Sequence, residues 1–279
     1  MILQRYTHKF IQIIVIGTVV LSGCSGAPTP NSSAAHPTTS RATCPTTTAS
    51  PTNSGPVRVS AKGASLRIAN DGTPRIFYGA VLQNTSEHLF AGQVRVRIAF
   101  KDARGKRILL TREGVQTTFV MHSAKLAPGE RFGLGGNLAV VLGNDSTAPE
   151  AVTVDTKIIT QWWVDACRFS MRRVVVNPTS VTTKDGTAIF ELDVTIPSAC
   201  PFEKLPRSAQ LYAVYRDQSD RVVGGDQLRI DSQKAPSTAA THPQPVLAIG
   251  YMVEQGDPDR TEVFADLSCV DTSGQARPQ

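Results

Sequence analysis

The sequence predicts an all-β protein with two antiparallel β-sandwich modules that follow a disordered Ser/Thr/Pro-rich linker. From Val57 onward, short apolar alternations are separated by turn residues. No apolar stripe of period 3.6 is long enough for a helix, and a weak repeat recurs at an offset of 115 residues. Many short strands at this spacing are typical of sandwiches and barrels.

The expected strands follow the runs of alternating polarity. Between positions 94 and 101, every second residue is apolar and most of the residues between them are basic, which predicts a sheet with one buried and one wet face. Turn signals such as Asn70-Asp71-Gly72 and Asp185-Gly186 separate most runs. The expected strands are 75–83, 93–101, 114–122, 131–140, 151–163, 168–177, 187–196, 209–216, 221–230, 246–252 and 261–269.

The internal repeat aligns residues 94–108 with residues 209–223. Each copy has an aromatic residue, a basic residue and an aspartate (Asp102 and Asp217), then a second basic residue four positions after the aspartate. A strand, a tight polar turn and a returning strand explain this pattern. The offset predicts two similar modules of roughly 110 residues, which is a usual sandwich size.

Three segments carry a family resemblance: 78–86 (YGAVLQNTS), 94–105, and Leu126-Ala127-Pro128-Gly129-Glu130. Together they resemble the small immunoglobulin-like modules of the FxLYD type, which recur in bacterial surface proteins and lipoproteins. The match covers about 78–136 and, more faintly, 187–230. The resemblance implies an immunoglobulin-like fold and a surface location, and it implies no enzymatic activity. We expect modules at 57–165 and 166–270, and a disordered tail at 271–279.

The N-terminus has the organisation of an export signal. Arg5 and Lys9 precede the twelve-residue apolar run 10–21, which is shorter than the about 20 residues of a membrane span. Leu21-Ser22-Gly23-Cys24 resembles a bacterial lipobox, which implies cleavage before Cys24 and a diacylglycerol and palmitate anchor on its thiol. We therefore expect a lipoprotein on the outer face of a cell membrane; the alternative is an ordinary signal peptide cleaved nearby.

Residues 24–56 form the expected linker. Ser, Thr and Pro make up 20 of the 32 residues from 25 to 56, without apolar periodicity, so nothing there offsets the entropy of ordering. We interpret the segment as a stalk between the lipidated cysteine and the soluble modules.

The five cysteines show no CxxC spacing, so the exported chain is expected to form disulfides. A hairpin over 168–197 would bring Cys167 and Cys200 together, and we favour that bridge. Cys200 with Cys269 is the main alternative. Cys44 would then be free, or joined to Cys269 or to another molecule.

No residue pattern predicts a catalytic site, a metal site or a cofactor. The histidines lack metal-ligand spacing, and Gly133-Leu134-Gly135-Gly136 lacks the third glycine of a nucleotide loop, so it is expected to be a flexible strand edge or bulge. Aspartates at positions 217, 220, 257 and 259 could be imagined as calcium ligands, but polar hairpin tips explain them better.

Trp162 and Trp163 are candidate partner-binding residues. Neighbours on a strand point to opposite faces, so one can be core while the other faces outward or toward the second module. An exposed tryptophan could bind a glycan face or a protein. Packing at the module junction is the simpler interpretation.

Charge and composition narrow the function. The formal charge of +6 falls to +4 once Arg5 and Lys9 leave with the signal. This suits anionic lipid headgroups or wall polymers, and no basic cluster of the nucleic-acid-binding type is present. We expect a non-catalytic binding or scaffolding lipoprotein with an envelope protein or glycan as partner. The alternative is an envelope hydrolase or small-ligand carrier with a site between the modules.

Overall fold

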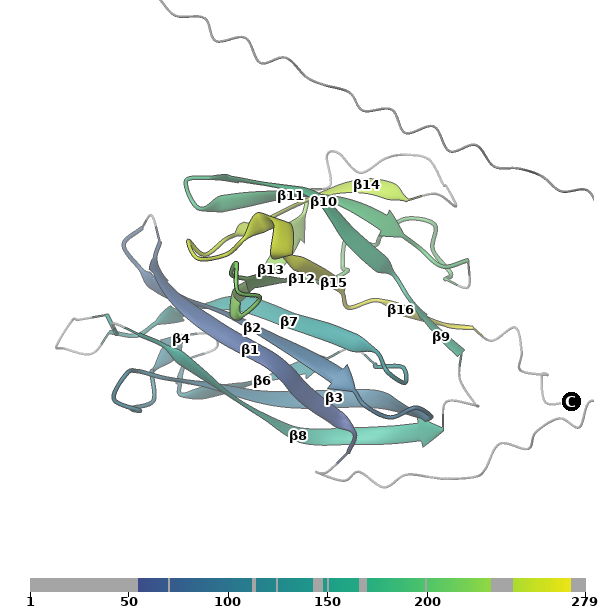
Figure 1. Cartoon of the computed structure of the whole chain (residues 1–279), viewed down its shortest axis with the longest axis horizontal. Helices are drawn as coiled ribbons and strands as arrows, with labels where there is room; N and C mark the ends of the chain where they lie inside the picture. Colours follow the sequence, from purple (N-terminus) through teal and green to yellow (C-terminus); the bar gives the residue numbers. More distant parts are fainter. Residues whose placement is uncertain are drawn as a thin grey trace, which may run out of the picture. The chain divides into compact units, whose positions relative to one another are not determined.

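The computed structural model describes residues 55–69, 71–111, 114–123, 125–142, 148–149, 151–165, 170–198, 200–231 and 243–271. These residues are all-β, as expected (Figure 1). Their only helical element is a single 3-10 turn at Pro258–Arg260. Residues 1–54, which include the expected leader, Cys24 and the expected stalk with Cys44, lie outside the described residues, as do Cys167 and positions 272–279.

The first eight strands form the first module. One sheet has the order β1-β2-β7-β4-β5, and a second has the order β6-β3-β8 (Figure 1). The strands are β1 (Val57–Ile68), β2 (Pro74–Asn84), β3 (Leu89–Lys101), β4 (Leu110–Thr111), β5 (Val115–Gln116), β6 (Thr118–Ser123), β7 (Arg131–Val140) and β8 (Thr153–Asp165).

The remaining strands form the second module, whose six-stranded sheet has the order β10-β11-β14-β13-β12-β15, with β16 and β9 paired separately. Only two residue pairs join β13 to β14, and one core contains side chains from both sides of that junction, so the sheet folds over into a half-barrel. The strands are β9 (Ser170–Arg173), β10 (Val175–Lys184), β11 (Thr187–Thr195), β12 (Leu211–Arg216), β13 (Val222–Ile230), β14 (Gln244–Tyr251), β15 (Glu262–Ala265) and β16 (Ser268–Asp271).

The alternation predicted for β3 is confirmed. Val94, Val96, Ile98 and Phe100 are fully buried in the core between the two sheets of the first module, whereas Arg97 on the other face is exposed. The second module has its own core, in which Phe190 and Tyr215 are fully buried. Both modules therefore have filled interiors. An immunoglobulin-like strand topology stays a prediction.

The two modules pack sheet on sheet, so the strands between them are buried on both faces. Tyr78 of β2 belongs to the first core, and its neighbour Phe77 belongs to the second. On β12, Tyr212 lies in the first core, where its ring meets Phe132 edge to face at 5.9 Å, while Leu211 lies in the second. Burial of these strands on both faces removes far more apolar surface from water than a contact limited to the edges of the two modules would.

A row of glycines makes this close packing geometrically feasible. Gly63, Gly79 and Gly135 lie directly opposite one another across β1, β2 and β7. A Cβ atom on any of them would meet a backbone carbonyl of the second module, the oxygen of Val222, Gly224 or Ala213 respectively, at 1.7–2.3 Å. Real side chains do not approach backbone this closely, so this row requires glycine.

The expectation of a flexible edge or bulge at Gly133–Gly136 is wrong. These residues lie in β7, an interior strand that pairs with β2 without a register shift and with β4 on its other side. All four are buried. The absence of side chains at Gly133 and Gly135 allows the second module to pack closely against β7, and it does not make the strand irregular.

The internal repeat is confirmed at the level of its turns. The Asp102 carboxylate accepts N–H bonds from Arg104 and Lys106, and the Asp217 carboxylate accepts the corresponding bonds from Ser219 and Arg221, all at 2.9 Å. Position 105 is a glycine at φ +78°, and its counterpart Asp220 has φ +63°. The same side-chain-capped turn therefore ends a strand in each module.

The first motif segment of the FxLYD resemblance interlocks with the third. The fully buried Asn84 amide donates to the carbonyls of Leu89, Leu126 and Ala127 at 2.8–3.2 Å. Glu130 accepts the Ala127 N–H at 2.7 Å and forms an ion pair with Arg173 of the second module. These motifs are thus turn and packing devices in the described structure.

The disulfide prediction needs correction, because Cys200 pairs with Cys269 rather than with Cys167. The two α-carbons lie 5.0 Å apart. A hairpin forms, but its first arm is β10, which begins at Val175 rather than at residue 168. The chain before it, β9, pairs with the C-terminal strand β16 and places Arg172 opposite Cys269. The long-range pairing of β9 with β16, which local pattern does not reveal, brings Cys269 to Cys200.

We predict that the Cys200→Ser/Cys269→Ser variant loses about 4 kcal/mol of unfolding free energy, because the bridge closes a loop across a sequence separation of 69. Urea unfolding of the oxidised chain measures the loss, with the chemically reduced wild type as the control. Non-reducing peptide mapping that joined Cys200 to Cys167 would contradict this pairing.

Candidate functional site

A cleft of about 560 Å³ opens at the junction of the two modules, and we call it the junction cleft. The first module contributes β2, β4, β6 and β7, and the second contributes β11, β13 and β14. Its polar side chains include Arg75, Asn137, Asp226 and Arg229, and its apolar wall includes Ile249 and Tyr251.

A chain of hydrogen bonds crosses the junction at the base of the cleft. Arg75 donates from Nη1 to Asn137 Oδ1 at 2.9 Å, and Asn137 donates from Nδ2 to Asp226 Oδ1 at 2.6 Å. Asp226 also accepts the backbone N–H groups of Gln227 (2.9 Å) and Tyr251 (2.8 Å). One carboxylate thereby connects β13, β14 and the first module.

Asp226 is an unusual carboxylate because it is only 1% exposed. Burial raises its pKa from 3.8 to about 6, and the hydrogen bonds from Tyr251, Asn137 and Gln227, together with the charge of Arg229, only partly oppose this shift. Nearby, burial raises the pKa of the Tyr215 hydroxyl, which donates to the Tyr251 carbonyl at 2.6 Å. The protonation of Asp226 therefore depends on the packing and hydrogen bonds of the junction.

The rim of the cleft offers unused binding groups. The Asn137 bond uses one N–H of Arg75, and within the described chain the other guanidinium N–H groups have no partner. Arg229 is exposed, and its side chain forms no hydrogen bond or ion pair with the described residues. Tyr251 and Ile249 are 49% and 40% exposed. Guanidinium groups beside an open aromatic face suit an anionic, hydroxyl-rich ligand better than an apolar one.

The lining does not favour catalysis. Asp226 is the single carboxylate among the described residues that line the cleft, and three N–H donors already occupy it. Glycoside hydrolysis needs a pair of carboxyl groups, and acyl transfer needs a nucleophile beside a base. The arrangement can hold a ligand, and its described groups supply neither pair.

Trp163 does not offer a binding surface. Its side chain is 5% exposed and lies in the first core, against Gly55 at the start of the described chain. It is therefore a packing residue. Trp162 is its neighbour on β8, and its side chain lies outside the described residues.

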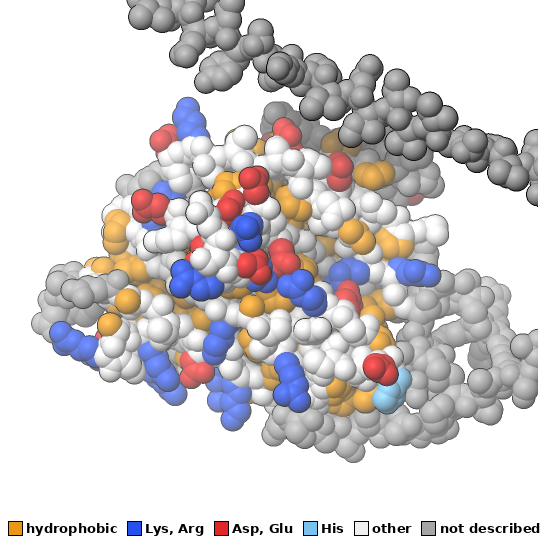
Figure 2. All heavy atoms as spheres, viewed as in Figure 1, with side chains coloured by type: hydrophobic (Ala, Val, Ile, Leu, Met, Phe, Trp, Pro, Cys, Tyr) orange, Lys and Arg blue, Asp and Glu red, His pale blue; other side chains and the backbone are white. Residues whose placement is uncertain are grey.

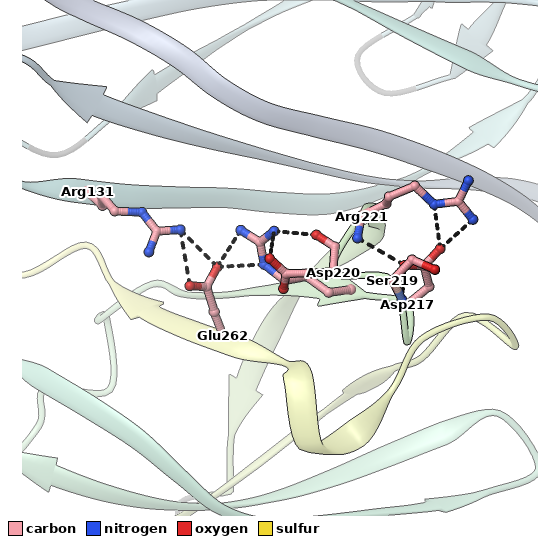
Figure 3. A network of polar contacts seen from close by, with 7 residues as sticks. Arg131, Asp217, Ser219, Asp220, Arg221 and Glu262 are labelled. Carbon is pink, nitrogen blue, oxygen red and sulfur yellow. Dashed lines mark hydrogen bonds and ion pairs between the residues drawn. The ribbon is translucent and has the colours of Figure 1, made fainter.

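The aspartates considered as calcium ligands cap turns and pair with arginines instead. Figure 3 shows Asp217 bound to Arg221 and Ser219. Asp220 pairs with Arg216 at 3.7 Å, and Arg216 also pairs with Glu262 at 3.0 Å. Glu262 in turn pairs with Arg131 of the first module at 3.2 Å. Asp257 caps the 3-10 turn by accepting the Asp259 N–H. No group of three or more metal-ligating side chains occurs among the described residues.

The residues of the junction cleft were missed in the sequence, although a signal for them exists. Gly135-Gly136-Asn137 and Gly224-Gly225-Asp226 are each a glycine pair followed by a polar residue inside an expected strand. Glycine in a strand interior marks close approach of another backbone. The two triplets meet, and their polar residues bond to each other.

Asp226 should make stability depend on pH. Between about pH 4 and pH 6 the folded chain binds more protons than the unfolded chain, so the unfolding free energy should fall by about 3 kcal/mol as pH rises through this window. Asp226→Asn should remove that fall, measured by urea unfolding from pH 4 to 7.5. Asp217→Asn is the control and should retain it. Equal pH dependence in wild type and Asp226→Asn would rule out this assignment.

Comparison with known proteins does not supply a function. No protein-family model matches the sequence, and the comparison with curated proteins finds no match. A search of the described residues for a helix with the length and hydropathy of a membrane span finds none. Function must therefore be inferred from the residues themselves.

Proposed function

We propose that this protein is a non-catalytic binding lipoprotein of the bacterial cell envelope, tethered outside the membrane through Cys24, with the junction cleft as its ligand site. The observation that carries the binding role is the cleft itself, because polar and aromatic side chains of both modules converge on it. Largely preformed concave sites with a few converging polar groups are the usual form of ligand sites.

The lipid anchor is supported by the sequence Leu21-Ser22-Gly23-Cys24 directly after an apolar run. Two or more acyl chains on one cysteine hold a protein at a membrane far longer than one chain does. Membership of the FxLYD-type modules is part of the same proposal. It is supported by the motif residues Asn84 and Glu130, whose contacts hold adjacent turns together.

An anionic glycan is the ligand class that the cleft fits best. Arg75 and Arg229 supply positive charge, Asn137 and Gln227 supply amides, and Tyr251 presents a half-exposed ring. Sugar rings stack on aromatic faces, and carboxylates or phosphates pair with guanidinium groups. A hydrolase acting in the same cleft is the weaker proposal, because the described lining lacks a second carboxylate.

Cys24→Ala should move the protein from the membrane fraction to the soluble fraction, because the acceptor thiol for the lipid is lost. Carbonate washing followed by immunoblotting measures the distribution, and Cys44→Ala is the matched control that should stay with the membrane. Retention of Cys24→Ala after the wash would disprove the lipid anchor.

Tyr251→Ala and Arg75→Gln should each weaken binding of uronic-acid oligosaccharides about tenfold, since each removes one contact worth roughly 1.4 kcal/mol. Isothermal titration calorimetry measures the affinity. Arg221→Gln, on a hairpin that does not line the cleft, is the control and should bind as wild type does. If the wild type binds no uronate, or if all variants bind equally, the cleft is not a glycan site.

A further inference from the structure

The outer face of the β6-β3-β8 sheet is a second surface, and it carries several basic side chains. Its side chains alternate with the buried residues of β3, so Arg95 and Arg97 point away from the core that holds Val94 and Val96. His122 of β6 lies opposite Arg95, and Lys157 of β8 lies opposite Arg97. We call Arg95, Arg97, His122, Lys157 and Lys101 the basic face.

Within the described residues, two exposed basic side chains of this face have no acidic partner. Lys101 forms an ion pair with Asp155 at 3.5 Å, but the side chains of Arg97 and Lys157 have no ion pair or hydrogen bond with the described residues. The Arg95 Nε atom is buried without a hydrogen-bond partner. Like charges directly opposite on neighbouring strands destabilise a sheet. Their juxtaposition is therefore better explained by an external anion than by internal packing.

Charge also differs between the modules. Residues 57–165 contain 14 Lys and Arg against 9 Asp and Glu, whereas residues 166–271 contain 11 against 14. In the view of Figure 2, Lys and Arg gather over the first module in the lower half, and most Asp and Glu lie over the second. A chain polarised in this way turns its first module toward a negative surface.

The point where the N-terminal segment joins the first module indicates which kind of anionic surface lies near the basic face. Gly55 packs against Trp163 of β8, a strand of the same sheet, and Cys24 precedes Gly55 by 31 residues. A segment of this length spans about 30 Å as a coil and about 100 Å as polyproline. If Cys24 is acylated, this tether keeps the basic face within reach of the headgroups of the same membrane. Three adjacent strands also present a broad sheet surface rather than a groove that would enclose a single polymer chain.

We propose that the basic face docks the first module on a bilayer surface rich in anionic phospholipid, which leaves the second module directed away from the membrane. Anionic leaflets attract each nearby Lys or Arg, and the attraction falls with ionic strength. Docking of this kind orients the protein and adds to an acyl anchor. It is distinct from the junction cleft, whose residues come from other strands and from both modules.

The test uses the chain from Ser25 to Gln279, which retains both cores and the Cys200–Cys269 bridge but lacks the thiol of Cys24. We expect it to co-sediment with phosphatidylcholine vesicles that contain phosphatidylglycerol at least tenfold better than with pure phosphatidylcholine vesicles. The difference should shrink at high salt. Because this chain has no lipid, the result does not depend on whether Cys24 is acylated in the cell.

Arg97→Gln/Lys157→Gln should weaken vesicle binding about tenfold or more, since each basic residue contributes roughly fivefold. Lys184→Gln/Arg207→Gln removes the same charge from exposed positions of the second module and should bind as wild type does. Circular dichroism and Tm of both variants verify folding.

Three results would overturn the proposal. In the first, the wild type fails to bind anionic vesicles. In the second, the Lys184→Gln/Arg207→Gln variant loses as much vesicle binding as the Arg97→Gln/Lys157→Gln variant, so net charge alone explains the binding. In the third, a soluble glycerol-phosphate polymer binds in preference to vesicles and depends on Arg97 and Lys157, which would assign the basic face to a wall polymer instead.

Discussion

Gly63, Gly79 and Gly135 lie side by side across three strands, and the backbone of the second module passes directly over them. Their missing side chains set the distance between the modules. At that distance Phe77 reaches the second core and Tyr212 reaches the first. Two sandwiches that would otherwise meet through a polar, mobile interface instead share buried surface over whole strands.

The same contact positions the ligand site. Asn137 follows the glycine pair of β7, and Asp226 follows the glycine pair of β13, so close packing of the glycines brings the two polar side chains to 2.6 Å. The cleft then opens where the packed glycines end. A rigid junction gives a preorganised site, and preorganisation reduces the entropy that ligand binding must offset. The burial of Asp226, which raises its pKa, makes the stability of this junction sensitive to pH.

Local pattern predicted most of the strands, because the alternation that buries Phe100 and exposes Arg97 acts within a few residues. It missed β1, whose alternation is weak because small residues such as Gly63 replace large apolar ones. It gave the Cys200–Cys269 bridge only as the alternative to Cys167–Cys200, because that bridge depends on the pairing of β9 with β16. The junction cleft depends on the packing between the modules, a long-range contact that alternation does not encode.

Calorimetry of the chain from Ser25 to Gln279 tests the shared junction most directly. If the modules are one cooperative unit, the wild type unfolds in a single transition whose calorimetric and van't Hoff enthalpies agree. Gly135→Ala should separate the modules and split that transition in two, while Gly105→Ala, at an exposed turn with open space around it, should only lower Tm. Two independent transitions in the wild type, or a Gly135→Ala variant that unfolds like the wild type, would contradict the account.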